Sequence, residues 1–490
     1  MLTGLLIALP LFVSLLIFFL RPPYARQMAV VGSVLQFLLG LFVISQLKHT
    51  HEAQHVINLP WVSSMGIHFY AGIDGISAIL VLLTNLLVPF ILLVNGKDKA
   101  SENAGFYGLV MLMQAALVGV FTARDGFLFY IFWEMALIPI YFICLMWGGK
   151  ERMRITLKFF IYTMSGSLLM LLAFIIIYLH TPLPHQFSFE AMLTASKNMD
   201  AGLQGILFWL IFLAFAIKIP VFPFHTWQPD TYTDAPVQGT MLLSGIMLKM
   251  GTYGLMRWLL PVLPLGVSNW GYTAIVLSVI GIIYGAVIAI MQEDYKRLAA
   301  YSSFSHAGLI AAGIFTLQTS ALQGALIQML SHGILVVALF YLIELIEQRS
   351  HTRNISELGG IRTQSPIFSA VFMLVLLGSV ALPLTSGFVG EFLLIGGLYA
   401  YHPYLAAIAG VTIILGAVYM LRSFRRSLLG EPQKATFGFA EISSNEKLIL
   451  YPLILLVFFI GIYPKPLLDL SEPSVKHLLQ TIQSPNLTLR

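Results

Sequence analysis

The 490-residue sequence contains only one cysteine, Cys144. A single thiol cannot form a disulfide within the chain, and an iron–sulfur cluster takes about four ligands. The sequence also lacks a GxGxxG motif after a strand, a Walker loop and an HExxH motif. We therefore expect a chain that carries no redox cofactor, metal ion or nucleotide of its own.

Charged residues are also scarce: they make up 10% of the chain, against roughly 25% in a typical soluble domain. Apolar runs of about 18 residues or more recur from end to end, and each is typical of a transmembrane helix. A membrane barrel would instead need alternating segments of about ten residues. The predicted fold class is an all-α polytopic membrane protein. The first run, 2–20, has no basic region before it and no small-residue cleavage site, so we expect a retained helix rather than a signal peptide.

About fourteen transmembrane helices are predicted, and two of them are broken. Pro220 and Pro223 interrupt the seventh, because proline cannot donate the helical hydrogen bond to the carbonyl four residues earlier. The twelfth is too long for one straight crossing, and Pro383 and Gly387 in VALPLTSGFVG should break it. Two broken helices in corresponding halves of a chain point to an inverted repeat with a site between them. The spans lie near 2–20, 28–47, 74–94, 106–122, 127–147, 158–179, 204–224, 237–259, 270–291, 299–317, 322–346, 366–400, 404–421 and 448–464.

The basic residues are divided unevenly between the two sets of loops. The loops that join spans 1–2, 3–4 and so on hold eighteen Lys and Arg residues, whereas the other loops and both tails hold seven. The positive-inside rule places the richer set in the cytoplasm and both termini on the other side. This asymmetry accounts for the net charge of +5, so no nucleic-acid partner is expected. Two lysines remain, Lys218 and Lys249, and both lie within predicted spans.

Several ionisable side chains fall at membrane depth. A charged residue at the centre of a membrane helix costs about 2.5–3.5 kcal/mol even on the permissive insertion scale, and such residues usually mark an ion or proton path. Burial disfavours the charged form of a lysine, whereas a nearby carboxylate favours it. A Lys218–Glu134 pair would therefore hold a proton in one conformation and release it in another. The candidates are Glu134, Lys218, Lys249, His306, His332 and Glu391, together with His225 at the end of a broken span.

Each candidate also has a purely structural interpretation. The lysines could pair inside the bundle without any transport role. His306 lies in a serine-rich segment and could bond a neighbouring helix, and His225 could contact a loop. Asp74, near the start of a span, is consistent with a helix cap, and Glu344 lies within a turn or two of the cytoplasm.

Two long stretches, FAIKIPVFPFHTWQPDTYTDAPVQGTMLLSGIMLKMGTYGLMRW and EDYKRLAAYSSFSHAGLI, resemble the antiporter-like subunits of respiratory complex I. With the glutamate of FWEMALIP, the resemblance covers most of the chain. It implies fourteen helices, two of them broken, in two inverted five-helix repeats, at 106–262 and 263–425. Helices 1–3 would occupy 1–105, and helix 14 and a tail would occupy 426–490. Each member of that family is thought to carry one proton channel.

The resemblance also implies a role for each candidate residue. Glu134 and Lys218 would be the coupled ion pair, and Lys249 would be the central relay residue. His306 would link the two half-channels, and Glu391 would be the terminal residue facing the next subunit. His332 and His225 complete the candidate set.

Glu391 also distinguishes between members of the family. Other siblings, and the sodium/proton antiporter subunits, usually place lysine there. One sibling continues in a long lateral helix, whereas only about 26 residues follow Pro464 here. The resemblance implies a proton-translocating subunit of an NADH–quinone oxidoreductase in the inner (plasma) membrane. Its partners would be the other membrane-arm subunits, and FMN, iron–sulfur clusters, NADH and quinone would bind to partner subunits.

Two alternatives remain open from the sequence. A subunit of a multi-chain cation/proton antiporter or of a membrane-bound hydrogenase would share the fold and the lysines, so that only Glu391 and the partners would discriminate. A structural membrane scaffold would use the interior charges for assembly alone. In that case, neutralising Lys218 or Lys249 would disturb assembly but spare transport.

Overall fold

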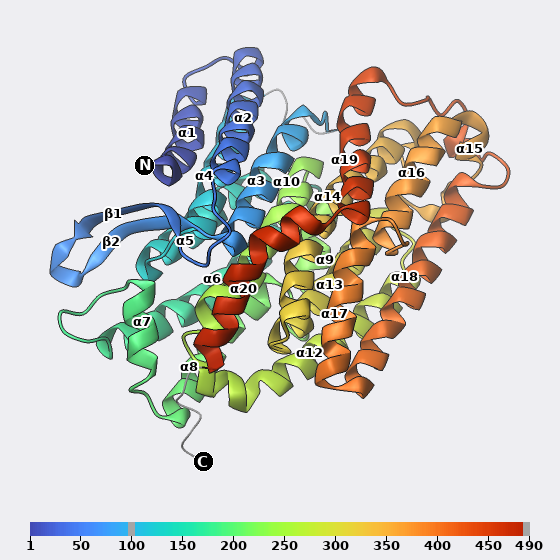
Figure 1. Ribbon diagram of the computed structural model, residues 1–490. Coiled ribbons are helices and arrows are strands. Elements are labelled where there is room, and N and C mark those ends of the chain that lie inside the picture. The colour runs from blue at the N-terminus through green and yellow to red at the C-terminus, as the bar shows by residue number, and fades with distance from the viewer. Residues whose placement is uncertain (97–102, 484–490) are drawn as a thin grey trace.

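The computed structural model describes residues 1–96 and 103–483, and these residues are mostly helical (Figure 1). Eleven of the described helices are long and apolar enough to cross a membrane. The polytopic helical membrane class predicted from composition is therefore confirmed. The eleven are α2 (Pro22–Ser45), α3 (Gly75–Leu93), α4 (Ala104–Thr122), α5 (Gly126–Trp147), α6 (Arg152–Leu179), α8 (Ala201–Lys218), α12 (Pro264–Ile290), α13 (Tyr295–Phe315), α14 (Thr319–Ser350), α18 (Pro403–Leu428) and α19 (Ser444–Ile462).

Shorter elements complete the described chain. The helices α1 (Leu2–Ile17) and α16 (Pro366–Ser379) are apolar but shorter than the eleven. The remaining helices are α7 (Phe189–Ser196), α9 (Gln228–Asp234), α10 (Val237–Leu242), α11 (Leu248–Gly254), α15 (Ile361–Gln364), α17 (Ser386–Tyr401) and α20 (Lys465–Gln483), with 3₁₀ turns at Ser63–Met65, Ile355–Glu357 and Lys434–Thr436.

The helix α14 lies at the centre of the bundle. It packs against α3, α13, α16, α17, α19 and α20, and its most apolar 18-residue window is completely buried. In Figure 1, α1 and α2 lie on one flank and α16 and α18 on the opposite flank. A helix covered on all sides can carry polar groups only if other protein groups receive them, so α14 is where interior polar contacts are expected.

The first predicted break is present. The helix α8 ends at Lys218, and α9 begins ten residues later at Gln228. The carbonyl of Ala216, which Pro220 cannot bond, accepts instead from the backbone N–H of Val221 at 2.7 Å. The indole N–H of Trp227 donates to the carbonyl of Ile217 at 2.9 Å. The freed backbone groups thus find partners within the protein, as a broken membrane helix requires.

The second predicted break separates α16 from α17. Between them, Ala381 and Leu384 adopt left-handed backbone angles, with φ of 55° and 75°. Neither conformation can continue a right-handed helix. A third interruption was not predicted. The expected straight span 237–259 is divided by two π-helical turns, Leu243–Met247 and Leu255–Leu259, which flank α11. Such turns inside helices often occur at functional sites.

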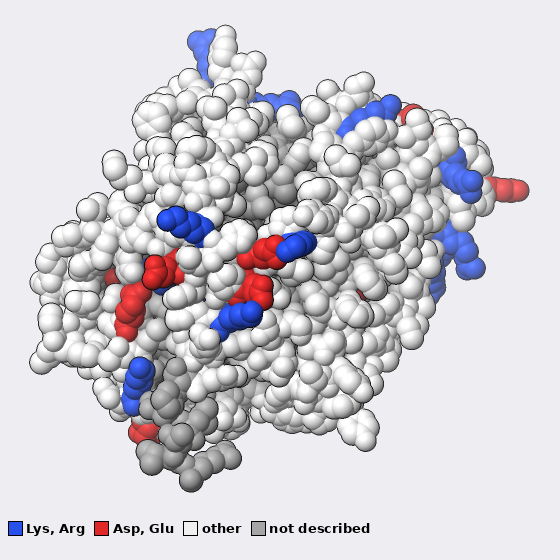
Figure 2. Space-filling model, in the orientation of Figure 1, with Lys and Arg blue, Asp and Glu red and all other residues white. Residues whose placement is uncertain are grey.

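Two further elements lie where the sequence analysis expected only a loop and a tail. The strands β1 (Gln54–Val62) and β2 (Ile67–Ile73) form an antiparallel hairpin, with Ile57 opposite Ala71. The helix α20 is amphipathic and buries Val475 and Leu479 against the bundle. Its outer side carries the ion pairs Lys465–Asp469 and Lys476–Glu472, each at 2.6 Å. Figure 2 shows charged side chains gathered along α20 on a face that is otherwise largely uncharged.

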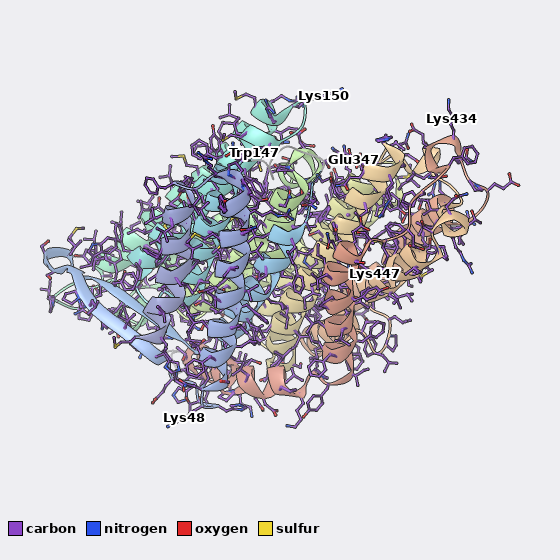
Figure 3. The ribbon with its side chains drawn as sticks, turned by 90° about the horizontal axis from the view of Figure 1, so that it is seen from above. Lys48, Trp147, Lys150, Glu347, Lys434 and Lys447 are labelled. Atoms are coloured by element: carbon purple, nitrogen blue, oxygen red, sulfur yellow. The ribbon has the colours of Figure 1, made fainter. Side chains whose placement is uncertain are left out.

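The two ends of the bundle differ in charge. Figure 3 places Lys150 and Lys434 at one end, called the basic end below, and Lys48 at the other. The hydroxyl of Thr3 donates to the carbonyl of His55 at 2.7 Å, so the N-terminus lies beside the β-hairpin, at what is called the hairpin end. The basic residues Lys97, Lys99 and Arg490, which contribute to the predicted charge asymmetry, lie outside the described residues.

Candidate functional site

The structure brings four of the seven candidate residues into one buried row. Lys249 on α11 is completely buried, and His332 on α14 and Glu391 on α17 are almost completely buried. His306 on α13 is mostly buried, with 12% of its side chain exposed. The row therefore crosses from the helix interrupted by π turns, through α14 and α13, to the second half of the broken helix pair α16–α17.

The row begins with a direct contact between Lys249 and His332. The Lys249 Nζ lies 2.8 Å from His332 Nδ1 and donates a second hydrogen bond, of 2.5 Å, to the carbonyl of Ser244. The Ser244 carbonyl belongs to the first π-helical turn. The lysine is thus held by one neutral base and one backbone carbonyl rather than by a carboxylate.

Two glycines explain how these helices come close enough for that contact. Gly333 follows His332 on α14, and Gly245 follows Ser244 in the π turn. A Cβ at Gly333 would lie 2.9 Å from the Gly245 carbonyl oxygen and 2.7 Å from the Leu83 side chain. The backbones therefore approach each other because neither residue has a side chain at the crossing point, as is common between membrane helices.

The row continues from His332 to Glu391 through His306. The ring centroids of His332 and His306 lie 5.9 Å apart. The His306 Nδ1 lies 3.0 Å from Glu391 Oε1, and Gln328 Nε2 donates to the same oxygen at 3.3 Å. The two atoms are within ion-pair distance, but His306 Nδ1 is not aligned for a hydrogen bond in this conformation. The Glu391 carboxylate therefore has two polar neighbours, one from α13 and one from α14.

A small cavity fills the gap between the two imidazoles. It has a volume of about 20 Å³, and His306, His332 and Glu391 line it together with Ser303 and Gln328. The His332 Nε2 and the Ser303 hydroxyl are buried and have no hydrogen-bond partner in the protein. A cavity of this size is large enough for one water molecule, and these polar groups would serve as its partners. One water bonded to these groups would connect His332 to His306.

Lys218 and Glu134 are neighbours but not an ion pair. The Lys218 Nζ lies 5.5 Å from the centre of the Trp133 ring and 5.9 Å from that of Phe159, which are cation–π distances. The Glu134 charge is close enough to act on Lys218, but the two groups are not in ion-pair contact. Glu134 Oε1 is buried without a hydrogen-bond partner. The predicted partners therefore influence each other electrostatically without forming an ion pair.

His225 lies in an aromatic pocket at the first helix break. Its ring stacks on Phe304 of α13 with centroids 4.5 Å apart and meets the Tyr284 ring of α12 edge-on at 5.0 Å. No contact among the described residues joins His225 directly to the row. Its contacts attach the broken helix to α12 and α13, so the expected loop contact is replaced by packing on two transmembrane helices.

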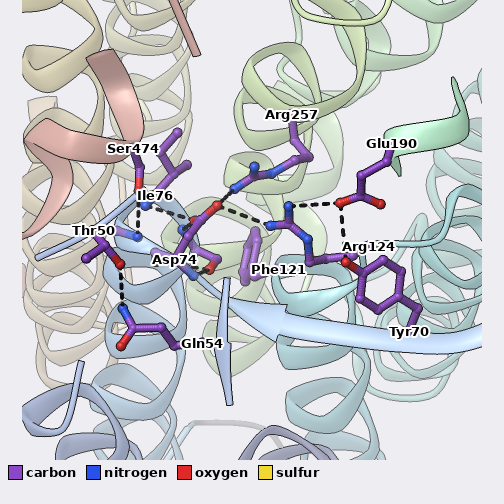
Figure 4. A network of polar contacts seen from close by, with 12 residues as sticks. Thr50, Gln54, Tyr70, Asp74, Ile76, Phe121, Arg124, Glu190, Arg257 and Ser474 are labelled. Carbon is purple, nitrogen blue, oxygen red and sulfur yellow. Dashed lines mark hydrogen bonds and ion pairs between the residues drawn. The ribbon is translucent and has the colours of Figure 1, made fainter. Parts of the chain in front are cut away.

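The interpretation of Asp74 as a helix cap is confirmed, and an ion pair is added to it. Asp74 caps α3 and forms a reciprocal capping box with Ser77. Figure 4 shows its carboxylate between Arg257, which it bonds directly, and Arg124, whose Nη1 lies 3.4 Å away. Burial alone would raise the pKa of Asp74, but the two guanidinium groups outweigh it and lower the pKa to about 2. Arg257 was not among the residues predicted from the sequence, although it lies two helical turns after Lys249.

Glu344 is buried near the basic end of α14, with 6% of its surface exposed. It accepts a hydrogen bond from Gln348 Nε2 at 3.0 Å. In the described ranges 1–96 and 103–483, no group of three or more His, Cys, Asp or Glu side chains is arranged to hold a metal ion.

Fold and site together define an integral membrane protein with a row of ionisable side chains across its interior. The family model described as NADH:quinone oxidoreductase/Mrp antiporter, TM, matches residues 123–416. Subunit M of NADH-quinone oxidoreductase from Rickettsia conorii is 39% identical over 461 residues, which cover 94% of this chain and 93% of that one. The Escherichia coli subunit M is 34% identical over 452 residues, or 91% and 89% of the two chains.

A solved structure agrees with these sequence matches. A chain of respiratory complex I from Thermus thermophilus with bound NADH superposes with a TM-score of 0.90 at 30% identity, over 98% of this chain and all of that one. The chain belongs to the NADH:quinone oxidoreductase/Mrp antiporter transmembrane family. The similarity to subunit M agrees with the expectation from Glu391.

Proposed function

We propose that this chain is a proton-translocating membrane-arm subunit of an NADH:quinone oxidoreductase. The observation that carries the proposal is the buried row Lys249–His332–His306–Glu391, in which each member either touches the next or faces it across a polar cavity. The names of the relatives supply the reaction to which proton movement would be coupled. NADH oxidation and quinone reduction would take place on partner subunits, which would bind FMN and iron–sulfur clusters.

The first proton transfer in this proposal runs from Lys249 to His332. A protonated Lys249 donates to the unprotonated Nδ1 of His332, which leaves the histidine proton on Nε2, beside the cavity. When Lys249 gives its proton to Nδ1, His332 releases the Nε2 proton to water in the cavity. One proton leaves the lysine and one reaches the water, so the imidazole ends neutral with its tautomer exchanged.

The second transfer runs from the cavity to Glu391. His306 takes a proton from the water and gives its Nδ1 proton to Glu391 Oε1, 3.0 Å away. Glu391 becomes a neutral carboxylic acid, and His306 returns to its neutral form. The Gln328 amide holds the carboxyl group in place from α14. Release of that proton to the far side or to a neighbouring subunit restores the carboxylate.

Loading of the row in this proposal starts at Lys218. Its buried ammonium depends on the Glu134 charge, so a small movement of that carboxylate changes how well Lys218 holds a proton. The helix α8 lies directly against α11, because Gly251 leaves room for Ile219: a Cβ at Gly251 would lie 2.6 Å from the Ile219 side chain. A proton on Lys218 would repel one on Lys249 and drive it toward His332.

The proposal extends to topology. The eleven long helices, α1, the helix 237–259 and the broken pair α16–α17 together make fourteen crossings. We place two five-helix repeats at 106–262 and 263–425, preceded by 1–105 and followed by 426–490. The basic end would face the cytoplasm and both termini the other side of the inner membrane, which accords with the loop charges.

The experiment that tests this function is purification of the tagged chain from its own membrane in mild detergent, followed by mass spectrometry of the associated proteins. We expect flavin and iron–sulfur proteins to co-purify with NADH–quinone activity. Small hydrophobic antiporter subunits without redox proteins would contradict the proposal and indicate a cation/proton antiporter instead.

A further inference from the structure

A second polar cavity lies at the basic end of the bundle. It has a volume of about 360 Å³ and is lined by Asp234, Lys296, Glu344, Glu347 and Arg353, among other residues. Three of these charged side chains have printed partners: Arg353 lies 3.7 Å from Glu347, and Lys296 donates to the Ala235 carbonyl at 2.5 Å. Glu344 lies one turn deeper than Glu347 on α14.

The two cavities lie end to end along the seam between α13 and α14. On α13, Lys296 lines the basic-end cavity and Ala299 lines the cavity at His332 and His306. On α14, the corresponding residues are Glu344 and Leu339. At about 1.5 Å rise per residue, the gap is roughly 4.5 Å along α13 and roughly 7.5 Å along α14. No more than about a turn and a half of helix therefore separates the basic-end cavity from the cavity at His332 and His306.

The inner-cavity residues nearest in sequence to Glu344 and Lys296 are apolar. Leu339, Val336 and Leu335 face the inner cavity from α14, and Ala299 faces it from α13. An apolar constriction between two polar spaces conducts only when water enters it, and it stops conduction when it dries. The seam between α13 and α14 therefore resembles a proton connection from the basic end to His332 that opens only when water enters it. This connection is separate from the route through Lys218.

We propose that Glu344 is a proton-loading residue at the basic end and that it reloads the His332–Lys249 pair through this seam. The inference rests on the proposed function and goes beyond it by adding an entry port. The Glu344 carboxylate takes a proton from water in the basic-end cavity and becomes a neutral acid. It then releases that proton to water in the seam and returns to the carboxylate. His332 receives a proton at Nε2 and passes its Nδ1 proton to a discharged Lys249.

The test is Glu344→Gln in the assembled complex, which removes the titratable group with almost no change in volume. Glu344→Asp restores a carboxylate at the same place. Glu431→Gln is the matched control, because Glu431 is an exposed acid on a loop outside both cavities. The quantity measured is the number of protons pumped per NADH oxidised in membrane vesicles. The amount of assembled complex is measured in parallel.

We expect Glu344→Gln to lower pumping per NADH as far as Lys249→Ala does, while Glu344→Asp and Glu431→Gln match the parent. Normal pumping by Glu344→Gln beside a defective Lys249→Ala would overturn the entry port and leave the proposed function standing. Normal pumping by both variants would contradict the proposed function. A lower yield of complex with normal pumping per NADH would show a merely structural role and also overturn the inference.

If the complex with Glu344→Gln does not assemble, a second variant still tests the proposal. Ala299→Ile keeps Glu344 and places three extra carbon atoms in the apolar seam, where Ala299 is 1% exposed. We expect the same loss of pumping per NADH from the complex that assembles. Full pumping with a filled seam would exclude this route.

Discussion

The Nζ of Lys249 lies 2.8 Å from Nδ1 of His332, and no carboxylate among the described residues forms an ion pair with this lysine. A buried lysine locked to a carboxylate keeps its proton, because separating the two charges is costly. A lysine that faces a neutral imidazole has no fixed counter-charge to hold its proton, so it can give that proton to the imidazole once the local charge changes. This contact therefore suits transfer better than it suits structural pairing.

His332→Gln tests whether the imidazole carries the proton. Glutamine can still accept the Lys249 hydrogen bond, but it cannot take a proton at one nitrogen and release one from the other. We expect the complex to assemble and proton transfer through this chain to slow by about 10²-fold or more. The measurement is the initial rate of proton release after NADH addition to vesicles.

The control for that variant is His351→Gln, at the exposed C-terminal end of the same helix. We expect it to pump like the parent. A His332→Gln complex with an unchanged rate would remove His332 from the row.

Gly333→Ala tests the close approach that permits the Lys249–His332 contact. The added Cβ would meet the Gly245 carbonyl at 2.9 Å, so α14 and the π-helical turn must separate. Overpacking of this kind costs about 1–3 kcal/mol. We expect a lower thermal midpoint together with weaker pumping per NADH.

Gly396→Ala is the matched control, because nothing lies within 4 Å of a Cβ at that position. Equal behaviour of the two variants would show that the glycine pair does not set the spacing of the row.

Glu134→Gln tests the electrostatic link to Lys218. The variant keeps the shape of the side chain but removes the charge that acts on the buried ammonium. We expect pumping per NADH to fall, because Lys218 loses the charge that favours its protonated form, while electron transfer from NADH continues. Glu151→Gln serves as the control, because Glu151 is an exposed acid whose ion pair with Arg154 is also exposed. Unimpaired pumping by Glu134→Gln would refute the link.

Asp74→Asn tests stability rather than transport. It leaves the guanidinium of Arg257 buried without its carboxylate, and breaking a buried pair in this way costs about 3–5 kcal/mol. We expect a clear drop in thermal stability, whereas Glu190→Gln, whose side chain is 55% exposed, should have little effect. Similar stabilities for the two variants would argue against an ion-pair role for Asp74.

The same residue predicts an acid dependence. The pKa of Asp74 is lowered to about 2 in the folded chain, against an ordinary value of 3.8. Its contribution to stability is therefore complete above about pH 4 and is lost as the pH falls through 2. A thermal-shift series from pH 7 to pH 3 should show that the difference between the parent and Asp74→Asn starts to shrink only below pH 4.

Much of the fold follows from local sequence signals. Long apolar runs predicted the membrane helices, and Pro220 and Pro383 predicted both breaks, because proline removes a helical hydrogen bond wherever it stands. The two π-helical turns beside Lys249 carry no such signal. They arise where α11 is packed on every side, so tertiary contacts decide them. The β-hairpin and α20 were missed because short strands and an amphipathic helix produce no long apolar run.

The sequence predicted which residues belong to the candidate site, but not which of them contact one another. A charge within an apolar run marks Lys249 or Glu391 as interior, but it does not say which neighbour it meets. The sequence paired Lys218 with Glu134, whereas the direct contacts join Lys249 to His332 and His306 to Glu391. Those partners lie on separate helices, and the glycines at 245 and 333 set their spacing across 88 residues of chain.

The measurement that tests the central claim most directly is the number of protons pumped per NADH by the assembled complex with Lys249→Ala. The row loses its first proton carrier, while electron transfer takes place on other subunits. We predict that this variant assembles and oxidises NADH, but pumps fewer protons per NADH than the parent. Parent-level pumping per NADH by a fully assembled Lys249→Ala complex would contradict the account.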